Sequence, residues 1–355
     1  MEKEIVFVSN FMGNGGAARV ISILAKRFSE KGYQVCIITF PFDAKEYPED
    51  ENIEYIKVVP KNKSGLKRKF ERIRLLRKEL KKHPRAYIIS FEYFMNMQTI
   101  VSTIGLKNKL IISERNDPAS MGGDFPTNVI RNILYFFCDI LVCQTPDAKA
   151  YFPRLIQKKT VIIPNPIKED LPKPWTGERD SVIVTFCRLE KQKNLTLLID
   201  AFELFCKRHQ EYKLYIYGDG KEKQKLQQYV EKKGLGKNII IHEAVSDVHE
   251  RVKRSMMFVS TSNYEGLSNS MIEAMAIGLP TIATDCPCGG ARMMINNGIN
   301  GILIPMNEKK SLLEAMEKIS SDFQLQKYLS ENATKVYGLL QPSIIVKMWE
   351  EILVK

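Results

Sequence analysis

The sequence is poor in cysteine pairs and in histidine, which excludes several classes of protein. Its seven cysteines are scattered, and only Cys286 and Cys288 are close, with a single residue between them. That spacing suits neither a disulfide nor a zinc pair, and an odd number of cysteines without a framework indicates reduced thiols. With only four histidines and no cluster of candidate ligands, we expect no metal site.

Long hydrophobic runs are also missing. The most apolar stretch, residues 129–143, is interrupted by Arg131, Asn132 and Asp139, so it is too short and too polar to span a bilayer. A strand is expected at residues 5–8, where a signal peptide would otherwise lie. We therefore expect a cytoplasmic protein, and a chain of 355 residues with 44% hydrophobic and 26% charged residues is typical of two globular domains.

Short apolar runs alternate with helical patterns along the whole chain. In the first half we expect helices at residues 17–30 and 128–137 and strands at 4–9, 34–40, 87–91, 109–113 and 140–144. In the second half we expect helices at 195–206 and after 268, and strands at 181–186, 213–217, 239–241, 257–260 and 281–284. This alternation predicts an α/β protein with buried parallel sheets and crossover helices.

Two prolines near the middle of the chain suggest the boundary between domains. Residues 163–166 read Ile-Pro-Asn-Pro, and prolines both fix the backbone and remove hydrogen-bond donors. We expect an N-terminal Rossmann-like domain at residues 1–164 and a second at 165–338. The helix in residues 339–355 is expected to return to the first domain.

A glycine-rich loop follows the first strand. Residues 13–18 read Gly-Asn-Gly-Gly-Ala-Ala, which fits the dinucleotide-binding pattern G-x-G-x-x-A. That pattern also needs an acidic residue at the end of the second strand, but Asp43 lies beyond it, so an NAD-dependent dehydrogenase has little support. A tight strand-to-helix turn is a simple alternative. We favour a loop in which the N–H groups of Gly15 and Gly16 approach a phosphate or sugar at a helix N-terminus.

Two glutamates separated by seven residues form the most informative pattern. The N–H groups of the residues between Glu265 and the next helix, namely Gly266, Leu267, Ser268 and Asn269, would open that helix and attract a diphosphate. Glu273 could accept hydrogen bonds from both hydroxyls of a ribose, and Glu265 could reach a sugar hydroxyl. The alternative is that Glu265 caps the helix and Glu273 is a solvated position.

The segment 264–280 that contains both glutamates resembles the donor-binding motif of retaining glycosyltransferase family 4, which has the GT-B fold. Residues 284–287 and 298–301 also fit the family, and the loops at residues 15–17 and around 188 extend the resemblance over nearly the whole chain. The resemblance implies two Rossmann-like domains whose sheets face each other across an active-site cleft. It also implies that Glu265 contacts the donor sugar and Glu273 the nucleotide ribose.

A second element is similar to the family pattern F-x-G-R-L-x-x-x-K-N. It spans residues 186–194, and Cys187 stands where the family has glycine. The resemblance implies that Arg188 and Lys193 bind the donor diphosphate, where fixed cations stabilise the charge that develops on the leaving group. The sequence contains no Asp-x-Asp, by which glycosyltransferases of the other major fold hold a metal ion. We therefore expect a metal-independent enzyme that needs no cofactor besides its UDP-sugar co-substrate.

The loop at residues 112–118 departs from the family. Family members commonly carry a histidine here near the reacting sugar, and this sequence has Arg115 at that position. Arg115 could hold a donor or acceptor phosphate, and Asp117 is the nearest carboxylate that could assist the acceptor hydroxyl. In the front-face mechanism often described for this fold, the leaving phosphate itself takes the acceptor proton, so a dedicated base is not required.

Basic residues are concentrated in one segment. Residues 61–85 contain twelve Lys or Arg and two Glu, which gives +10 of the total charge of +12. Residues 64–83 predict an amphipathic helix with an apolar stripe formed by Leu66, Phe70, Ile73, Leu76 and Leu80. This helix could be a crossover helix packed on the first sheet, it could lie on an anionic membrane, or both. Nucleic acid is disfavoured because no nucleic-acid-binding fold or aromatic platform is evident.

The resemblance is strongest to bacterial transferases that extend lipid-linked glycans. It implies transfer of a HexNAc or hexose from a UDP-sugar to an undecaprenyl-diphosphate-linked saccharide, in capsule or O-antigen synthesis. Such an enzyme would lie on the inner face of the cytoplasmic membrane. The alternatives are an epimerase or phosphorylase of related fold, or a non-catalytic sugar- or lipid-binding module. No pyridoxal-phosphate lysine motif supports the phosphorylase, and the two glutamates argue against the module.

Overall fold

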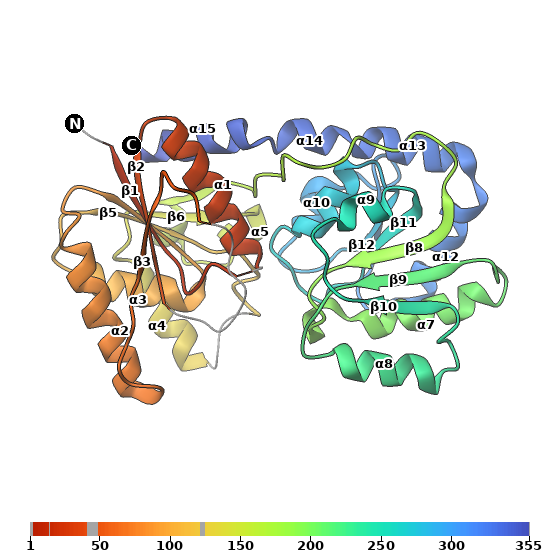
Figure 1. Ribbon diagram of the computed structural model, residues 1–355, viewed down its shortest axis with the longest axis horizontal. Helices are drawn as coiled ribbons and strands as arrows, with labels where there is room; N and C mark the ends of the chain where they lie inside the picture. The colour runs from red at the N-terminus through yellow and green to blue at the C-terminus, as the bar shows by residue number, and fades with distance from the viewer. Residues whose placement is uncertain (1–2, 14, 41–48, 121–124, 355) are drawn as a thin grey trace. The chain divides into compact units, whose positions relative to one another are not determined.

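The structure is a computed structural model that describes residues 3–13, 15–40, 49–120 and 125–354. The chain forms two compact units (Figure 1), of which unit 1 comprises residues 1–166 and 342–355 and unit 2 comprises residues 167–341. Each unit has one parallel sheet with helices, so the predicted two-domain α/β architecture is confirmed. Asn14 of the glycine-rich loop and Asp43 lie outside the described residues.

Unit 1 contains a seven-stranded parallel sheet in the order β3-β2-β1-β4-β5-β6-β7. Its strands are β1 (Glu4–Val8), β2 (Gln34–Thr39), β3 (Glu54–Lys57), β4 (Tyr87–Phe91), β5 (Lys109–Ser113), β6 (Ile140–Cys143) and β7 (Thr160–Ile162). The predicted strands occur within one residue of their expected bounds. The edge strands β3 and β7 were not predicted, because each is short and β3 is only half-buried.

The helices of unit 1 are α1 (Gly16–Glu30), α2 (Gly65–Leu80), α3 (Tyr93–Thr103), α4 (Phe125–Tyr135), α5 (Pro146–Ala150), α6 (Arg154–Gln157) and α15 (Pro342–Leu353). Helix α3 packs between α2 and α4 (Figure 1). Helix α3 was not predicted, because its buried positions include polar residues such as Asn96, Thr99 and Ser102.

Helix α15, the last in the chain, packs against α1 and belongs to unit 1. Its Trp349 is fully buried and stacks on Phe91 of β4, with ring centroids 5.8 Å apart. Lys109 at the start of β5 donates hydrogen bonds to the carbonyl groups of Ile352 and Leu353, at 3.0 and 3.1 Å. The C-terminal helix is therefore tied to the sheet of unit 1 by both apolar and polar contacts.

Unit 2 contains a six-stranded parallel sheet in the order β10-β9-β8-β11-β12-β13. Its strands are β8 (Asp180–Phe186), β9 (Lys213–Tyr217), β10 (Ile239–His242), β11 (Ser255–Ser260), β12 (Thr281–Thr284) and β13 (Ile302–Ile304). Its helices are α7 (Leu195–Cys206), α8 (Lys223–Lys232), α9 (Val248–Val252), α10 (Asn269–Ala276), α11 (Gly290–Met294), α12 (Lys309–Ser321), α13 (Phe323–Ala333) and α14 (Lys335–Leu339). The core forms where α7 and α12 pack together against this sheet.

The basic helix α2 differs from its expected pattern. Leu76 and Leu80 are fully buried, but Leu66 and Phe70 are 71% and 70% exposed, so only the C-terminal half of the predicted stripe packs on the protein. Arg72 is directed inward and donates to Asn10 Oδ1 at 2.7 Å. Its guanidinium lies 3.8 Å from the centroid of the Phe40 ring, and burial lowers its pKa to about 10. Within the described ranges, no helix is both long enough and apolar enough to cross a membrane.

Candidate functional site

The loop that follows β8 carries Arg188 and is held by two glycines. The N–H of Cys187 donates to the carbonyl of Tyr217 at 3.0 Å, and the N–H of Leu189 donates to the carbonyl of Asp219, just beyond β9, at 2.9 Å. A Cβ atom added at Gly218 would lie 1.9 Å from the carbonyl oxygen of Cys187, and one at Gly220 would lie 2.3 Å from that of Leu189. The two backbones run in contact because both positions lack side chains.

Arg188 and Lys193 lie on this same loop in different environments. Arg188 is exposed, and its side chain makes no hydrogen bond or ion pair with any residue that the structure describes. Lys193 is nearly buried and forms an ion pair with Oε1 of Glu265. Burial alone would lower the pKa of Lys193, but the negative charge of Glu265 outweighs it, and the net effect raises that pKa. Lys193 is therefore a fixed cation at neutral pH.

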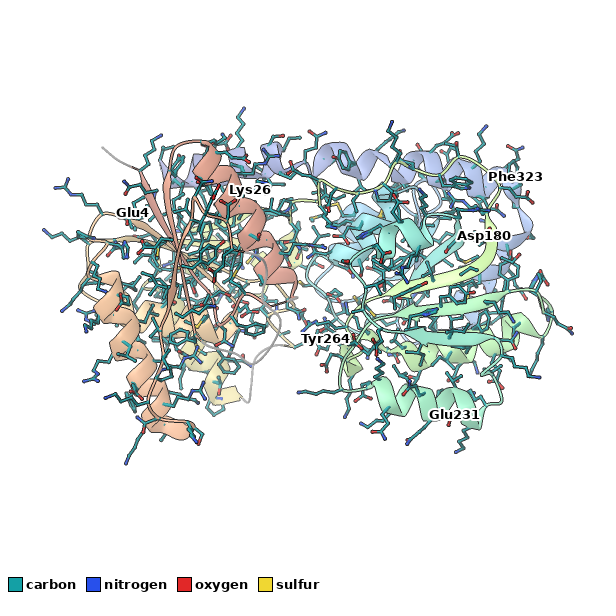
Figure 2. All side chains as sticks on the ribbon, viewed as in Figure 1. Glu4, Lys26, Asp180, Glu231, Tyr264 and Phe323 are labelled. Carbon is teal, nitrogen blue, oxygen red and sulfur yellow. The ribbon has the colours of Figure 1, made fainter. Side chains whose placement is uncertain are left out.

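The loops after β8 and β11 are joined by backbone and side-chain hydrogen bonds. Thr261 Oγ1 donates to the carbonyl of Lys193 at 2.9 Å, and the N–H of Asn263 donates to that of Gln192 at 2.8 Å. The amide of Gln192 donates to the carbonyl of Tyr264 at 2.7 Å. Strand β8 begins at Asp180, and Figure 2 shows Tyr264 at the opposite end of unit 2. Tyr264 therefore lies at the carboxyl edge of the sheet. Ligand sites of α/β sheets lie at this edge.

A third segment fixes the backbone of Glu265. The N–H of Glu265 donates to the carbonyl of Pro287 at 2.6 Å, and its carbonyl accepts from the N–H of Cys288 at 2.8 Å. A Cβ atom at Gly290 would lie 1.7 Å from the carbonyl oxygen of Gly266. Three loops, after β8, β11 and β12, therefore meet at Glu265.

Helix α10 begins next to this glutamate. Ser268 is its N-cap, and its hydroxyl accepts from the N–H of Met271 at 3.5 Å. Gly266, Leu267 and Ser268 are buried, whereas Asn269 is half-buried. The first turn contains no acidic residue. The positive end of the helix dipole thus follows Glu265 closely in the chain, and the carboxylate of Glu265 pairs with Lys193.

Glu273 lies inside α10 and is only 3% exposed. Its Oε2 lies 2.9 Å from Nε2 of His249 in α9. The alternative that Glu273 is a solvated helix position is therefore wrong. The sequence pattern did not single out His249, because no spacing rule connects a histidine in one short helix with a glutamate 24 residues later.

In unit 1, Arg115 follows β5 and is directed onto aromatic rings. Its guanidinium lies 4.5 Å from the ring centroid of Phe91 and 5.6 Å from that of Trp349. Nη1 donates to Oδ1 of Asn165 at 3.0 Å, while Nε and Nη2 are buried with no hydrogen-bond partner among the described residues. Burial lowers the pKa of Arg115 to about 9, so the group stays charged at neutral pH.

The carboxylate of Asp117 accepts hydrogen bonds from residues of its own turn. One oxygen accepts from the N–H of Ala119 at 3.1 Å and the other from the hydroxyl of Ser120 at 2.5 Å. Asp117 is 4% exposed. The neighbouring Glu114, which the sequence did not single out, is fully enclosed and accepts from the hydroxyl of Tyr135, and burial raises its pKa to about 7. These carboxylates stabilise the loop that carries Arg115.

The glycine-rich loop leads into α1 of unit 1. The N–H of Gly15 donates to the carbonyl of Gly13 at 2.6 Å, and α1 begins at Gly16. This N-terminus has neither a side-chain cap nor an acidic residue in its first turn, and the space beside Gly15 is open. Its first N–H groups can therefore receive an anion. In the described part of the chain, the seven cysteines are free thiols and no three His, Cys, Asp or Glu are grouped to hold a metal ion.

The structure thus brings Arg188, Lys193, Glu265 and the start of α10 together, and it places Glu273 in the same helix. Arg115, Gly15 and Gly16 belong to unit 1. Two α/β units with parallel sheets, one of them with cations and glutamates on loops at its carboxyl edge, are the arrangement of GT-B proteins, a class that includes glycosyltransferases.

Comparison with known families gives the same class. Residues 167–336 match the family model described as "Glycosyl transferases group 1", and residues 14–171 match the one described as "Glycosyltransferase Family 4". Together the two matches span most of the chain. The protein belongs to the family-4-type glycosyltransferases of the GT-B fold, as the sequence motifs predicted.

Curated relatives and solved structures agree with this assignment. A Campylobacter jejuni enzyme is 26% identical over 99% of this chain and 98% of its own length; it is named as an alpha-1,4-N-acetyl-D-galactosaminyltransferase acting on a GalNAc-GalNAc-diNAcBac-PP-undecaprenol. The amylovoran biosynthesis glycosyltransferase AmsD of Erwinia amylovora is 25% identical over 99% of this chain and all of its own length. The structure of Anabaena HepE with UDP and glucose has a similar fold, with a TM-score of 0.84 at 17% identity and full coverage of both chains.

The glycine contacts of the Arg188 loop give a prediction. Gly218→Ala should displace the loop, because its Cβ would collide with the carbonyl of Cys187, and overpacking of this kind typically costs about 1–3 kcal/mol. We expect a lower melting temperature and at least roughly tenfold slower sugar transfer, measured by thermal unfolding and nucleotide release. Gly236→Ala is the control, since nothing lies within 4 Å of the added Cβ. Equal behaviour of the two variants would contradict the loop contact.

Proposed function

We propose that this protein is a retaining, metal-independent hexosyltransferase. It moves a HexNAc or hexose from a UDP-sugar to an undecaprenyl-diphosphate-linked saccharide in bacterial surface glycan synthesis. The observation that supports this most directly is the cluster of Arg188 and Lys193 beside Glu265 and the N-terminus of α10, with the buried Glu273 in the same helix.

In this proposal the donor binds to unit 2 through its charges. The diphosphate is held by Arg188, by Lys193 and by the first N–H groups of α10, which together replace a metal ion. Glu273 accepts hydrogen bonds from the two ribose hydroxyls, and Glu265 from a hydroxyl of the sugar. Gly15 and Gly16 at the start of α1 supply further N–H groups for the phosphate or the sugar.

The chemistry follows from where charge develops. The bond between the anomeric carbon and the β-phosphate oxygen breaks, and negative charge accumulates on the departing phosphate, where Arg188 and Lys193 stabilise it. The acceptor hydroxyl attacks from the same face and passes its proton to that phosphate, so the product keeps the α configuration. Arg115, whose Nε and Nη2 have no hydrogen-bond partner among the residues that the structure describes, is assigned to a donor or acceptor phosphate. Asp117 is disfavoured as a base because both of its oxygens stabilise a turn.

The acceptor and the membrane are assigned from the relatives and from the surface of unit 1. The C. jejuni relative is named for a saccharide carried on PP-undecaprenol. Residues 61–85 carry most of the net positive charge and would face anionic lipid at the inner face of the cytoplasmic membrane. Leu66 and Phe70 are exposed among these charges. Helix α4, on the other side of α3, also exposes apolar side chains, at Val129, Ile130 and Ile133.

The first experiment is nucleotide release from UDP-, GDP- and ADP-sugars, with and without undecaprenyl-diphosphate-linked saccharides. We expect release from one donor, acceleration by acceptor, no effect of EDTA, and an α-linked product by NMR. Glu273→Ala should weaken donor binding by about tenfold or more, since a hydrogen bond to a charged group contributes about 1.5–3 kcal/mol. Glu250→Ala, which removes an exposed glutamate of α9, is the control. Donor binding without any turnover would favour the sugar-binding module, and a changed sugar nucleotide without acceptor would favour the epimerase.

The ion pair between Lys193 and Glu265 gives a second prediction. Without donor, Glu265 neutralises the cation that the diphosphate needs. Glu265→Gln should therefore bind the free nucleoside diphosphate more tightly, by roughly tenfold, although sugar transfer slows by about 10²-fold or more. Titration calorimetry and turnover measure the two effects. Glu190→Gln removes a charge from the same loop and should change neither. Weaker nucleotide binding in Glu265→Gln would contradict the assignment of Lys193. The variants Lys193→Ala and Arg188→Ala should mainly lose turnover.

Membrane binding is tested by flotation with vesicles containing anionic lipid. The variant replaces the exposed cations Lys67, Lys69, Arg74 and Lys78 by Gln and leaves Arg72 in place, because Arg72 is part of the packing of unit 1. We expect binding to fall by about tenfold or more, since each cation near an anionic surface contributes about 1 kcal/mol. The control replaces four exposed lysines of unit 2, at positions 207, 221, 232 and 237. An equal loss in both variants, or none in the first, would remove the membrane assignment.

A further inference from the structure

His249 is a buried histidine that directly contacts one of the two glutamates of the donor site. It lies in α9 and is 6% exposed, and its Nε2 is 2.9 Å from Oε2 of Glu273. Its ring meets the ring of Phe186 edge-on, with centroids 5.4 Å apart. Phe186 in turn packs on Phe258 of β11, with centroids 4.9 Å apart. The imidazole therefore packs on the last residue of β8, which is itself packed on β11.

The contact has a clear physical consequence for Glu273. The last torsion of a glutamate side chain is broad and does not by itself fix the plane of the carboxylate. Glu273 is only 3% exposed, and polar side-chain atoms that are shielded from water in this way are normally hydrogen-bonded. An Nε2–H on His249 supplies a donor at one oxygen and sets the plane of the group, as partners of ligating side chains do elsewhere.

We propose that His249 is a positioning residue for nucleotide recognition. Its Nε2–H holds the Glu273 carboxylate in the orientation that accepts hydrogen bonds from the 2′- and 3′-hydroxyls of the donor ribose. This inference rests on the proposed role of Glu273 in the donor site. It adds His249 to the residues of the proposed donor site. It also gives a physical reason why the ribose and diphosphate subsites keep a fixed spacing. Phe186, which packs against His249, is the last residue of β8, and the loop with Arg188 begins directly after it.

The role predicts an effect confined to the ribose. A residue that only supports the fold would, when replaced, weaken all nucleotides alike. Loss of the hydrogen bond to Glu273 instead reduces the preference for a nucleotide with both hydroxyls over one without them. Donor KM should rise while kcat changes little, because the ribose takes no part in bond cleavage.

The test first finds which of UDP, GDP and ADP the wild-type protein binds most tightly. It then compares the affinity for this nucleoside diphosphate with the affinity for its 2′,3′-dideoxy analogue. His249→Leu removes the donor, whereas His249→Gln places an amide N–H near the position of Nε2. We expect the affinity ratio of the two ligands to fall by about tenfold in His249→Leu and to be largely restored in His249→Gln, since one hydrogen bond to a charged group is involved. Affinity for the dideoxy analogue should stay the same in all three proteins.

Two further variants keep the result interpretable. His249→Asn is polar, but its shorter amide cannot reach Oε2, so it replaces the leucine variant if that one does not fold. His209→Leu removes a histidine that stacks on Phe205 at 4.4 Å in the same unit, and it should leave the ratio unchanged.

The outcomes separate this inference from the function on which it rests. An unchanged ratio in His249→Leu, with the ratio abolished in Glu273→Ala, would overturn the role of His249 alone. Equal weakening of both ligands in His249→Leu would show a structural role and would also overturn it. A wild-type protein that binds both ligands equally would overturn this inference together with the ribose assignment of Glu273.

Discussion

The ion pair between Lys193 and Glu265 is the interaction on which the arrangement of the site depends. The two residues are 72 positions apart, and their side chains are 12% and 15% exposed. Removing one partner would leave the other as an uncompensated charge in a poorly solvated place, which is far more costly than losing a surface pair. The pair therefore fixes the loop after β8 against the loop after β11. In the proposed function, the donor diphosphate and its sugar engage these same two charges.

The parallel sheet explains why such distant residues meet. In unit 2 the strands β8, β9, β11 and β12 all end at the same edge, so their loops are neighbours whatever their separation in sequence. Contact between loops then requires very small residues at the crossing points, and Gly218 and Gly290 fill this need. The rigid strands set the position of the edge. Gly218 allows the loop after β9 to approach the backbone beside Arg188, and Gly290 allows the loop after β12 to approach the backbone beside Glu265.

In unit 1, two arginine side chains pack inside the protein and are not directed into solvent. Arg72 and Arg115 both lie on aromatic rings and donate to asparagine side chains. Arg72 belongs to the most basic segment of the chain, yet it is directed away from solvent. Leu66 and Phe70 in the same helix are apolar but remain exposed, whereas the charged Arg72 packs inward. The exposed surface of α2 is therefore more apolar than the sequence pattern alone indicates.

The sequence by itself determined the strands, the main helices and the motifs that contain Arg188, Lys193 and the two glutamates. Hydrophobic periodicity and loop motifs are local, so they can be read along one segment. Only the tertiary structure decided that His249 meets Glu273, that Lys193 pairs with Glu265, and which half of the basic helix packs inward. These features depend on contacts between segments that lie far apart in the chain. Their energies come from burial and from paired charges, which exist only once the sheet has brought the loops together.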